Sequence, residues 1–118
     1  MRLTSFACLL GVALVGCASV PPPTSNVAVA REAAARVAGT PEIVALAPVE
    51  VERARTKVAA AETAMSAKEY DSARRYADEA EADARAAEAH SLSVKNERAL
   101  AEVRRALAAL REELDRKS

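Results

Sequence analysis

Residues 70–89 read YDSARRYADEAEADARAAEA and contain a clear helical pattern. Small apolar residues recur at alternating spacings of three and four, which places them on one face of an α-helix. They are Ala73, Ala77, Ala80, Ala84 and Ala87. Because an alanine side chain is a single methyl group, this face lets a neighbouring helix approach closely. The stretch therefore predicts one half of a tightly packed helical hairpin.

The preceding segment has the pattern of the other half. Pro48 suits the first position of a helix, and the segment is expected to end near Lys68. Its predicted inner face comprises Val51, Ala54, Val58, Ala61 and Met65, and its predicted outer face comprises Glu52, Arg53, Arg55, Lys57 and Glu62. We predict an antiparallel hairpin with its turn at residues 67–70, a second helix that opens at or near Asp71, and bulk near the turn from Tyr70 and Tyr76.

A shorter helix is predicted before the hairpin. Asn26 can cap it, and Gly39 and Pro41 stop it. Its apolar positions are Val27, Ala30, Ala34 and Val37. Residues 40–48 are interpreted as a connection whose apolar residues tuck under the hairpin; these are Ile43, Val44 and Leu46.

The last part of the chain has a different apolar pattern. Residues 90–96, HSLSVKN, interrupt the alanine face and suggest a bend or a change of partner, although a continuous helix is also possible without Gly or Pro. Two heptads of coiled-coil spacing follow, formed by Leu100, Val103, Leu107, Leu110 and Leu114. These residues are predicted to contact a partner helix or a second copy. The alternative is that the chain folds back and buries Val27 and Val37 against Leu107 and Leu110. The predicted fold class is all-α, with a short N-terminal helix, an antiparallel hairpin, and a long C-terminal helix of coiled-coil character.

The N-terminus has the features of a secretory signal. Arg2 supplies a positive charge, residues 6–15 are apolar or small, and this run is too short for a permanent membrane span. It ends Leu14-Val15-Gly16-Cys17, which resembles the lipobox of bacterial lipoproteins. The resemblance implies that Cys17 carries a diacylglyceryl group and becomes the acylated N-terminus after removal of residues 1–16. Residues 17–26 are interpreted as the lipidated cysteine and a Pro-rich tether. Ala18, in place of the aspartate that retains enteric lipoproteins in the inner membrane, indicates the periplasmic face of the outer membrane.

Length and composition limit the size and the functions of the chain after residue 16. The 118 residues leave room for one small domain, predicted at residues 27–90, followed by the amphipathic helix of residues 91–118. Lys+Arg and Asp+Glu both number 17 and are interspersed, which gives no electrostatic footprint for nucleic acid. Cys8 would leave with the signal and Cys17 would carry lipid, so no intramolecular disulfide is expected.

No catalytic or metal-binding constellation is predicted, and no cofactor. His90 is the single histidine, and a lone histidine without further ligands at metal spacing is expected to face solvent or a partner. The carboxylates Glu79, Glu81, Asp83 and Glu88 are interpreted as a solvated face, with Arg75 and Glu79 spaced for an exposed ion pair. We expect the chain not to be an enzyme.

The stretches ALAPVEVERARTKVAAAE and KEYDSARRYADEAEADARAAEA resemble an alanine-rich, all-helical domain of unknown function that recurs in proteobacterial lipoproteins. The positions that carry the resemblance are Ala47-Pro48, Ala54, Lys57, Tyr70-x-x-Ala73-Arg74 and Ala80-Glu81-x-Asp83-Ala84. Some relatives carry a following OmpA-like domain that would bind peptidoglycan. This chain ends at Ser118 without one, so wall binding by that route is not expected.

These observations favour a non-enzymatic, lipid-anchored helical module of the cell envelope that binds another envelope protein or itself. One alternative is a wall-associated spacer, because Arg116-Lys117-Ser118 resembles the end of the small helical lipoprotein whose terminal lysine is joined to peptidoglycan, although Ser118 follows Lys117 here. The other is an accessory subunit of an envelope enzyme complex.

Overall fold

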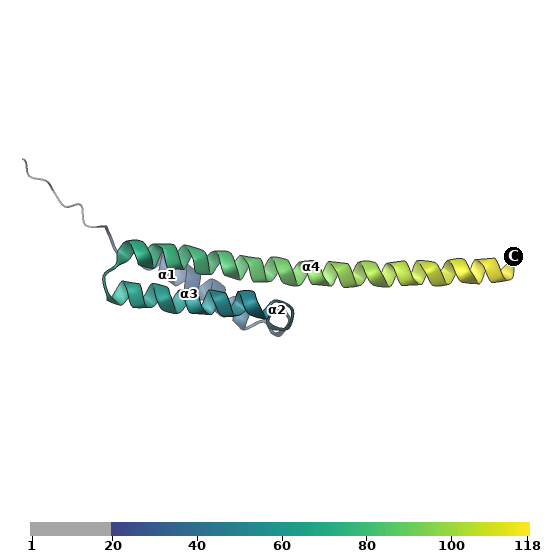
Figure 1. Cartoon of the computed structure of the whole chain (residues 1–118), viewed down its shortest axis with the longest axis horizontal. Helices are drawn as coiled ribbons and strands as arrows, with labels where there is room; N and C mark the ends of the chain where they lie inside the picture. Colours follow the sequence, from purple (N-terminus) through teal and green to yellow (C-terminus); the bar gives the residue numbers. More distant parts are fainter. Residues whose placement is uncertain (1–19) are drawn as a thin grey trace, which may run out of the picture.

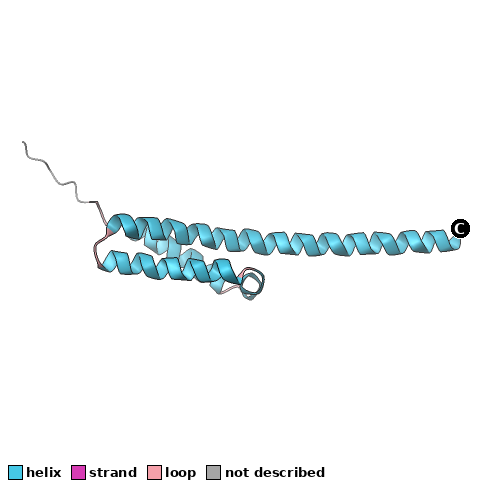
Figure 2. Ribbon diagram, viewed as in Figure 1, coloured by secondary structure: helices cyan, strands magenta, loops and turns pink. Residues whose placement is uncertain are grey.

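The computed structural model describes residues 20–118, and all regular structure within this range is helical (Figures 1 and 2). The helices are α1 (Thr24–Ala38), α2 (Pro41–Leu46), α3 (Pro48–Ser66) and α4 (Tyr70–Lys117). Helices α1 and α3 pack against the first half of α4, and the second half of α4 extends well beyond them (Figure 1). The predicted fold class is confirmed.

The core of the bundle is built almost entirely from alanine. Among residues 20–118, fifteen apolar residues are buried, of which twelve are alanine and three are valine, and Val37 is the largest fully buried side chain. The three predicted inner faces are confirmed, with Val58 and Met65 partly buried and the other members buried. Because small side chains separate the helices, the backbones lie close together and leave little room for added volume.

The connection after α1 differs in part from the prediction. Its central residues form the short helix α2, in which Ile43 and Leu46 are partly buried, as expected. Val44 is 36% exposed, so the prediction that it tucks under the hairpin is wrong. The reason is helical geometry, because residues 43 and 46 lie on one side of a helix and residue 44 lies on another.

The start of α1 also differs from the prediction. The helix begins at Thr24, the N-cap residue is Pro23, and no side chain caps it, so the prediction of an Asn26 cap is wrong. The backbone N–H of Val27 donates to the carbonyl oxygen of buried Pro23 at 3.1 Å. The Asn26 side chain instead lies within the helix and donates from Nδ2 to Oδ1 of Asp78 on α4, at 3.1 Å.

The α3–α4 turn forms without glycine. Lys68 adopts a left-handed backbone conformation, with a φ of 61°. Its N–H donates to the carbonyl oxygen of Met65, and the Glu69 N–H donates to that of Ala64. This pair of hydrogen bonds defines a Schellman motif, which ends α3 and reverses the chain. The turn falls where it was predicted, and α4 begins one residue before Asp71.

Helix α4 is continuous over 48 residues, about 72 Å at 1.5 Å per residue. Of the alternatives for residues 90–96, the bend is therefore wrong and the continuous helix is confirmed. Ser91 lies four residues after Ala87 and is itself buried, so a small side chain extends the inner face past the end of the alanine pattern. The folded-back alternative is wrong as well, because Leu107 and Leu110 are exposed rather than packed against α1.

Candidate interaction surface

Helix α4 divides into a packed half and a free half. The last buried residue is Ser91, and the Lys95 Nζ lies 3.1 Å from Oε2 of Glu42 on α2. From residue 95 onward every residue is exposed. The free half, residues 96–118, is about 35 Å long and projects from the bundle (Figure 1).

The free half carries the large aliphatic residues that the core lacks. Five of them lie at heptad spacing and are between 48% and 67% exposed: Leu100, Val103, Leu107, Leu110 and Leu114. We call this set the leucine stripe. An amphipathic helix normally turns its large apolar residues toward its own core. Here alanines fill the core and leucines face outward, so the free half presents an apolar surface with no covering element among residues 20–118.

The leucine stripe points away from the bundle. Leu100 follows the buried Ser91 by nine residues, which is two and a half turns and hence the opposite side of the helix. The five members together are rotated by about 140° from the inner face of α4, at about 100° per residue. Leu92 is 57% exposed and lies about three turns before Val103, so it extends the same surface toward the bundle.

The two flanks of the stripe differ in charge. Glu97, Arg104 and Arg111 follow one another at intervals of seven along one flank. The other flank carries Ala99 and Ala106, followed by Glu113. Near the tip, the Lys117 Nζ lies 3.1 Å from Oε1 of Glu113. A partner helix that lies on the stripe therefore meets acidic and basic groups on one side and mainly small residues on the other.

Ion pairs join the packed helices at several levels. The carboxylates of Glu79, Asp83 and Glu88, predicted to form a solvated face, pair with Lys57, Arg53 and Arg36 of the neighbouring helices, and those of Glu79 and Glu88 stay partly exposed. Glu81 pairs with Arg85 along α4 itself. The predicted Arg75–Glu79 pair is wrong: the Arg75 guanidinium and the Lys57 ammonium each lie 5.4 Å from the centre of the Tyr76 ring. These contacts fix which helix faces lie opposite each other.

Two groups that take part in interhelical contacts, Glu50 and Lys57, have shifted pKa values. A hydrogen bond from its own backbone N–H and the contact with His90 Nδ1, at 3.0 Å, lower the pKa of Glu50 below its ordinary value of 4.5. The hydrogen bond to Glu79 raises the pKa of Lys57 above 10.5. The Glu50 contribution to stability is therefore present above pH 4.5 and is lost as the pH falls through the folded-state pKa. The Lys57 contribution is present below pH 10.5 and is lost as the pH rises through its folded-state pKa.

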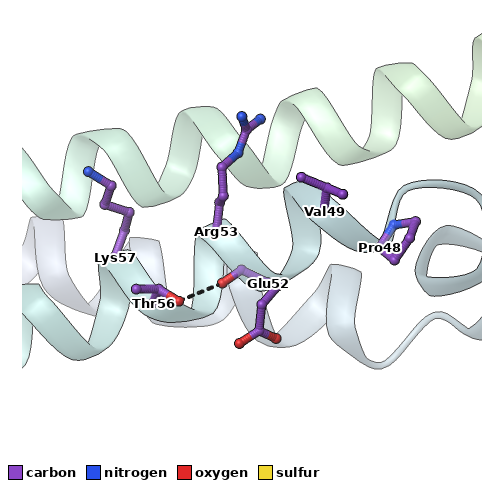
Figure 3. Close-up of a pocket in the computed structure, with 6 residues that line it drawn as sticks. All are labelled: Pro48, Val49, Glu52, Arg53, Thr56 and Lys57. Carbon is purple, nitrogen blue, oxygen red and sulfur yellow. Dashed lines mark hydrogen bonds between the residues drawn. The ribbon is translucent and has the colours of Figure 1, made fainter.

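An open groove lies on α3, lined by Pro48, Val49, Glu52, Arg53, Thr56 and Lys57 (Figure 3). The charged ends of Arg53 and Lys57 reach across to Asp83 and Glu79 of α4. Thr56 Oγ1 donates to the carbonyl oxygen of Glu52, one turn earlier, at 2.9 Å (Figure 3). Two of the lining cations thus link α3 to α4, the Thr56 hydroxyl is engaged within α3, and the groove presents mainly hydrocarbon.

The predicted lipidation residues and His90 lie away from the leucine stripe in the sequence. Cys17 and the lipobox residues Leu14, Val15 and Gly16 lie outside the described residues. His90 contacts Glu50 on α3, a pairing that sequence spacing could not reveal because 40 residues separate the two. In the part of the chain that the structure describes, no group of three or more His, Cys, Asp or Glu side chains is arranged to hold a metal ion. Among residues 20–118, no helix combines the length and the apolar character needed to cross a membrane.

Residues 25–103 match the family model described as "Domain of unknown function (DUF4398)", which covers more than half of the chain. No curated protein and no solved structure matches the chain. The matched range takes in the bundle and α4 as far as Val103. The match confirms the resemblance to a helical domain of unknown function.

Proposed function

The chain belongs to the DUF4398 family, and from this premise we propose that it is a lipid-anchored envelope protein whose α4 binds a partner helix through the leucine stripe. The observation that carries the proposal is the inverted placement of side-chain volume, with alanines in the core and five large aliphatic residues exposed on the free half of α4. Contiguous exposed apolar surface of this kind marks sites of protein interaction. The proposed role is non-enzymatic.

The positions of Val20 and of the free half of α4 support an arm that is anchored at one end and binds at the other. Val20 lies beside the α3–α4 turn, where it shares a surface depression with Tyr70 and Asp71. A lipid on Cys17 would therefore attach at the turn end of the bundle. The stripe begins about 45 Å from this turn and ends about 66 Å from it, measured along α4. In the proposal, the bundle and α4 hold the binding surface away from the anchor, on the periplasmic face of the outer membrane.

Photo-crosslinking in living cells tests the proposal. A photoreactive amino acid at Arg104, which flanks the stripe, is expected to give a discrete covalent adduct. The same amino acid at the neighbouring Arg105, on the opposite face of α4, is the matched control and is expected to give little. Addition of Leu107→Asp should abolish the Arg104 adduct, because a carboxylate in a desolvated helix contact is strongly unfavourable.

Equal adducts from both positions, unaffected by Leu107→Asp, would show that the stripe is not a binding surface. The adduct is then identified by mass spectrometry. A second copy of this chain and a different envelope protein are both compatible with the proposed function.

A further inference from the structure

The leucine stripe suits one definite partner, a second copy of the same chain. We propose that two copies pack the free halves of α4 against each other as an antiparallel coiled coil centred near residue 105. This inference rests on the proposed function and deepens it, because it names both the occupant of the stripe and its orientation.

The exposed position of the stripe and the length of the free half both allow two copies to pair. Since the stripe points away from the bundle, two copies can approach on their outer faces with both bundles on the outside. With the centre near residue 105, residue 117 of one copy lies beside residue 93 of the other. Each free half, about 35 Å long, therefore ends where the bundle of the other copy begins.

The apolar layers match in this register. In an antiparallel coiled coil, the first apolar position of a heptad faces the second apolar position of the partner helix. Leu100 then faces Leu110 of the second copy, and Val103 faces Leu107 of the second copy. The two-fold symmetry repeats both layers, so four consecutive layers are fully aliphatic. At each end Leu114 faces Asn96, a polar residue that marks the limit of the dry contact.

Charge is compatible with the same register. Glu97 faces Arg111 of the second copy, and the symmetry gives this attractive pair twice. Arg104 faces its own counterpart at the two-fold axis, which is a single repulsive pair. The small side chain of Ala106 faces its counterpart on the other flank and lets the helices approach.

Other arrangements match less well. A shift of one heptad toward the C-terminus sets Arg104 against Arg111 twice and buries Lys117 against Leu100. A shift of one heptad the other way pairs Glu97 with Arg104, which is also attractive. It sets Leu107 against Asn96 and Leu110 against Ser93, so the apolar layers decide against it.

A parallel pair has a different weakness. It sets Arg104 and Arg111 beside Ala99 and Ala106, so it gains no attractive charge pair along the stripe.

In the antiparallel pair the two α3–α4 turns lie about 105 Å apart, so the dimer is a rod with a bundle at each end.

Site-specific cross-linking of the full chain tests the arrangement. In a background with Cys8→Ser and Cys17→Ser, Arg104→Cys is expected to give a covalent dimer with a short bis-maleimide, because residue 104 lies near its counterpart. Asn96→Cys is expected to give none, because the two copies of residue 96 lie about 27 Å apart in the antiparallel pair. In a parallel pair the two copies of residue 96 face each other, so Asn96→Cys would be linked.

A link through Asn96→Cys would overturn the proposed orientation. No link from either variant, together with a monomer in sedimentation, would overturn self-association, while an Arg104 photo-adduct with another protein would leave the proposed function standing. A link through Arg104→Cys that persists with Leu107→Asp would place the contact elsewhere and also overturn the inference.

A charge exchange tests the register. Glu97→Arg turns two attractive pairs into repulsive ones and is expected to raise the dimer dissociation constant about tenfold, given the modest energies of exposed ion pairs. The double variant Glu97→Arg with Arg111→Glu should restore the wild-type value. If the second substitution fails to rescue the first, residues 97 and 111 do not face each other and the register is wrong.

Discussion

Replacement of Ala80 by leucine is expected to lower the free energy of unfolding by about 1 to 3 kcal/mol, the usual range for overpacking of a tight core. Ala80 is fully buried where all three long helices meet. Its neighbours there are Val27 and Ala30 of α1, Ala61 of α3 and Ala77 of α4. Three added carbon atoms at this point have no space, so at least one helix must move outward and lose contacts along its length.

Ala82→Leu is the matched control, because Ala82 lies on the same helix and is exposed. The same substitution in one helix carries the same change in helix propensity, so the difference between the variants reports packing alone. Thermal unfolding followed by circular dichroism measures it, with a shift of about 4 to 8 °C for each kcal/mol in a domain of this size. Equal midpoints for the two variants would contradict the assignment of the packed face.

Replacement of Cys17 by serine is expected to abolish labelling by a palmitate analogue and to leave an unprocessed precursor. The thiol is the group that accepts the diacylglyceryl unit in lipoproteins, and signal removal follows that step. Cys8→Ser is the matched control, since Cys8 lies within the predicted signal and outside the predicted lipobox. It should be labelled and processed like the wild type.

Metabolic labelling followed by gel analysis distinguishes the outcomes. Equal labelling of the wild type and Cys17→Ser would contradict the lipid anchor. It would leave the helical bundle and the stripe untouched, because neither includes Cys17.

The helical faces could be predicted because alanine spacing and helix geometry leave one arrangement. Ala73, Ala77 and Ala80 recur at three and four residues, and a helix brings such residues to one side whatever lies opposite. Local patterns therefore sufficed for the hairpin and for the position of its turn.

Features that depend on tertiary contacts could not be predicted from local sequence patterns. Ser91 is polar and interrupts the alanine pattern, yet its small size lets it continue the inner face. Asn26 has the chemistry of a helix cap, but Asp78 across the bundle takes its side-chain amide. The interhelical ion pairs escape sequence reasoning for the same reason, because their partners lie 22 to 53 residues apart.

The candidate surface is more predictable from the sequence than its surroundings. Heptad spacing alone identifies the five residues of the leucine stripe, and all five lie on the free half of α4. Leu92 is harder to recognise because it lies within the polar run of residues 90–96, and its spacing from Val103 is the available signal. The occupant that we propose, a second copy, follows only when two copies of the stripe are set against each other, so heptad spacing alone does not identify it.

The central claim is that the leucine stripe serves another chain and not the fold of its own chain. Sedimentation velocity of the full chain in mild detergent, with and without Leu107→Asp, tests it most directly when helicity is measured on the same samples. We predict that the wild type associates and that Leu107→Asp is a monomer whose bundle keeps its helicity. A monomeric wild type that loses helicity and stability on Leu107→Asp would show that the stripe packs within its own chain and would contradict the claim.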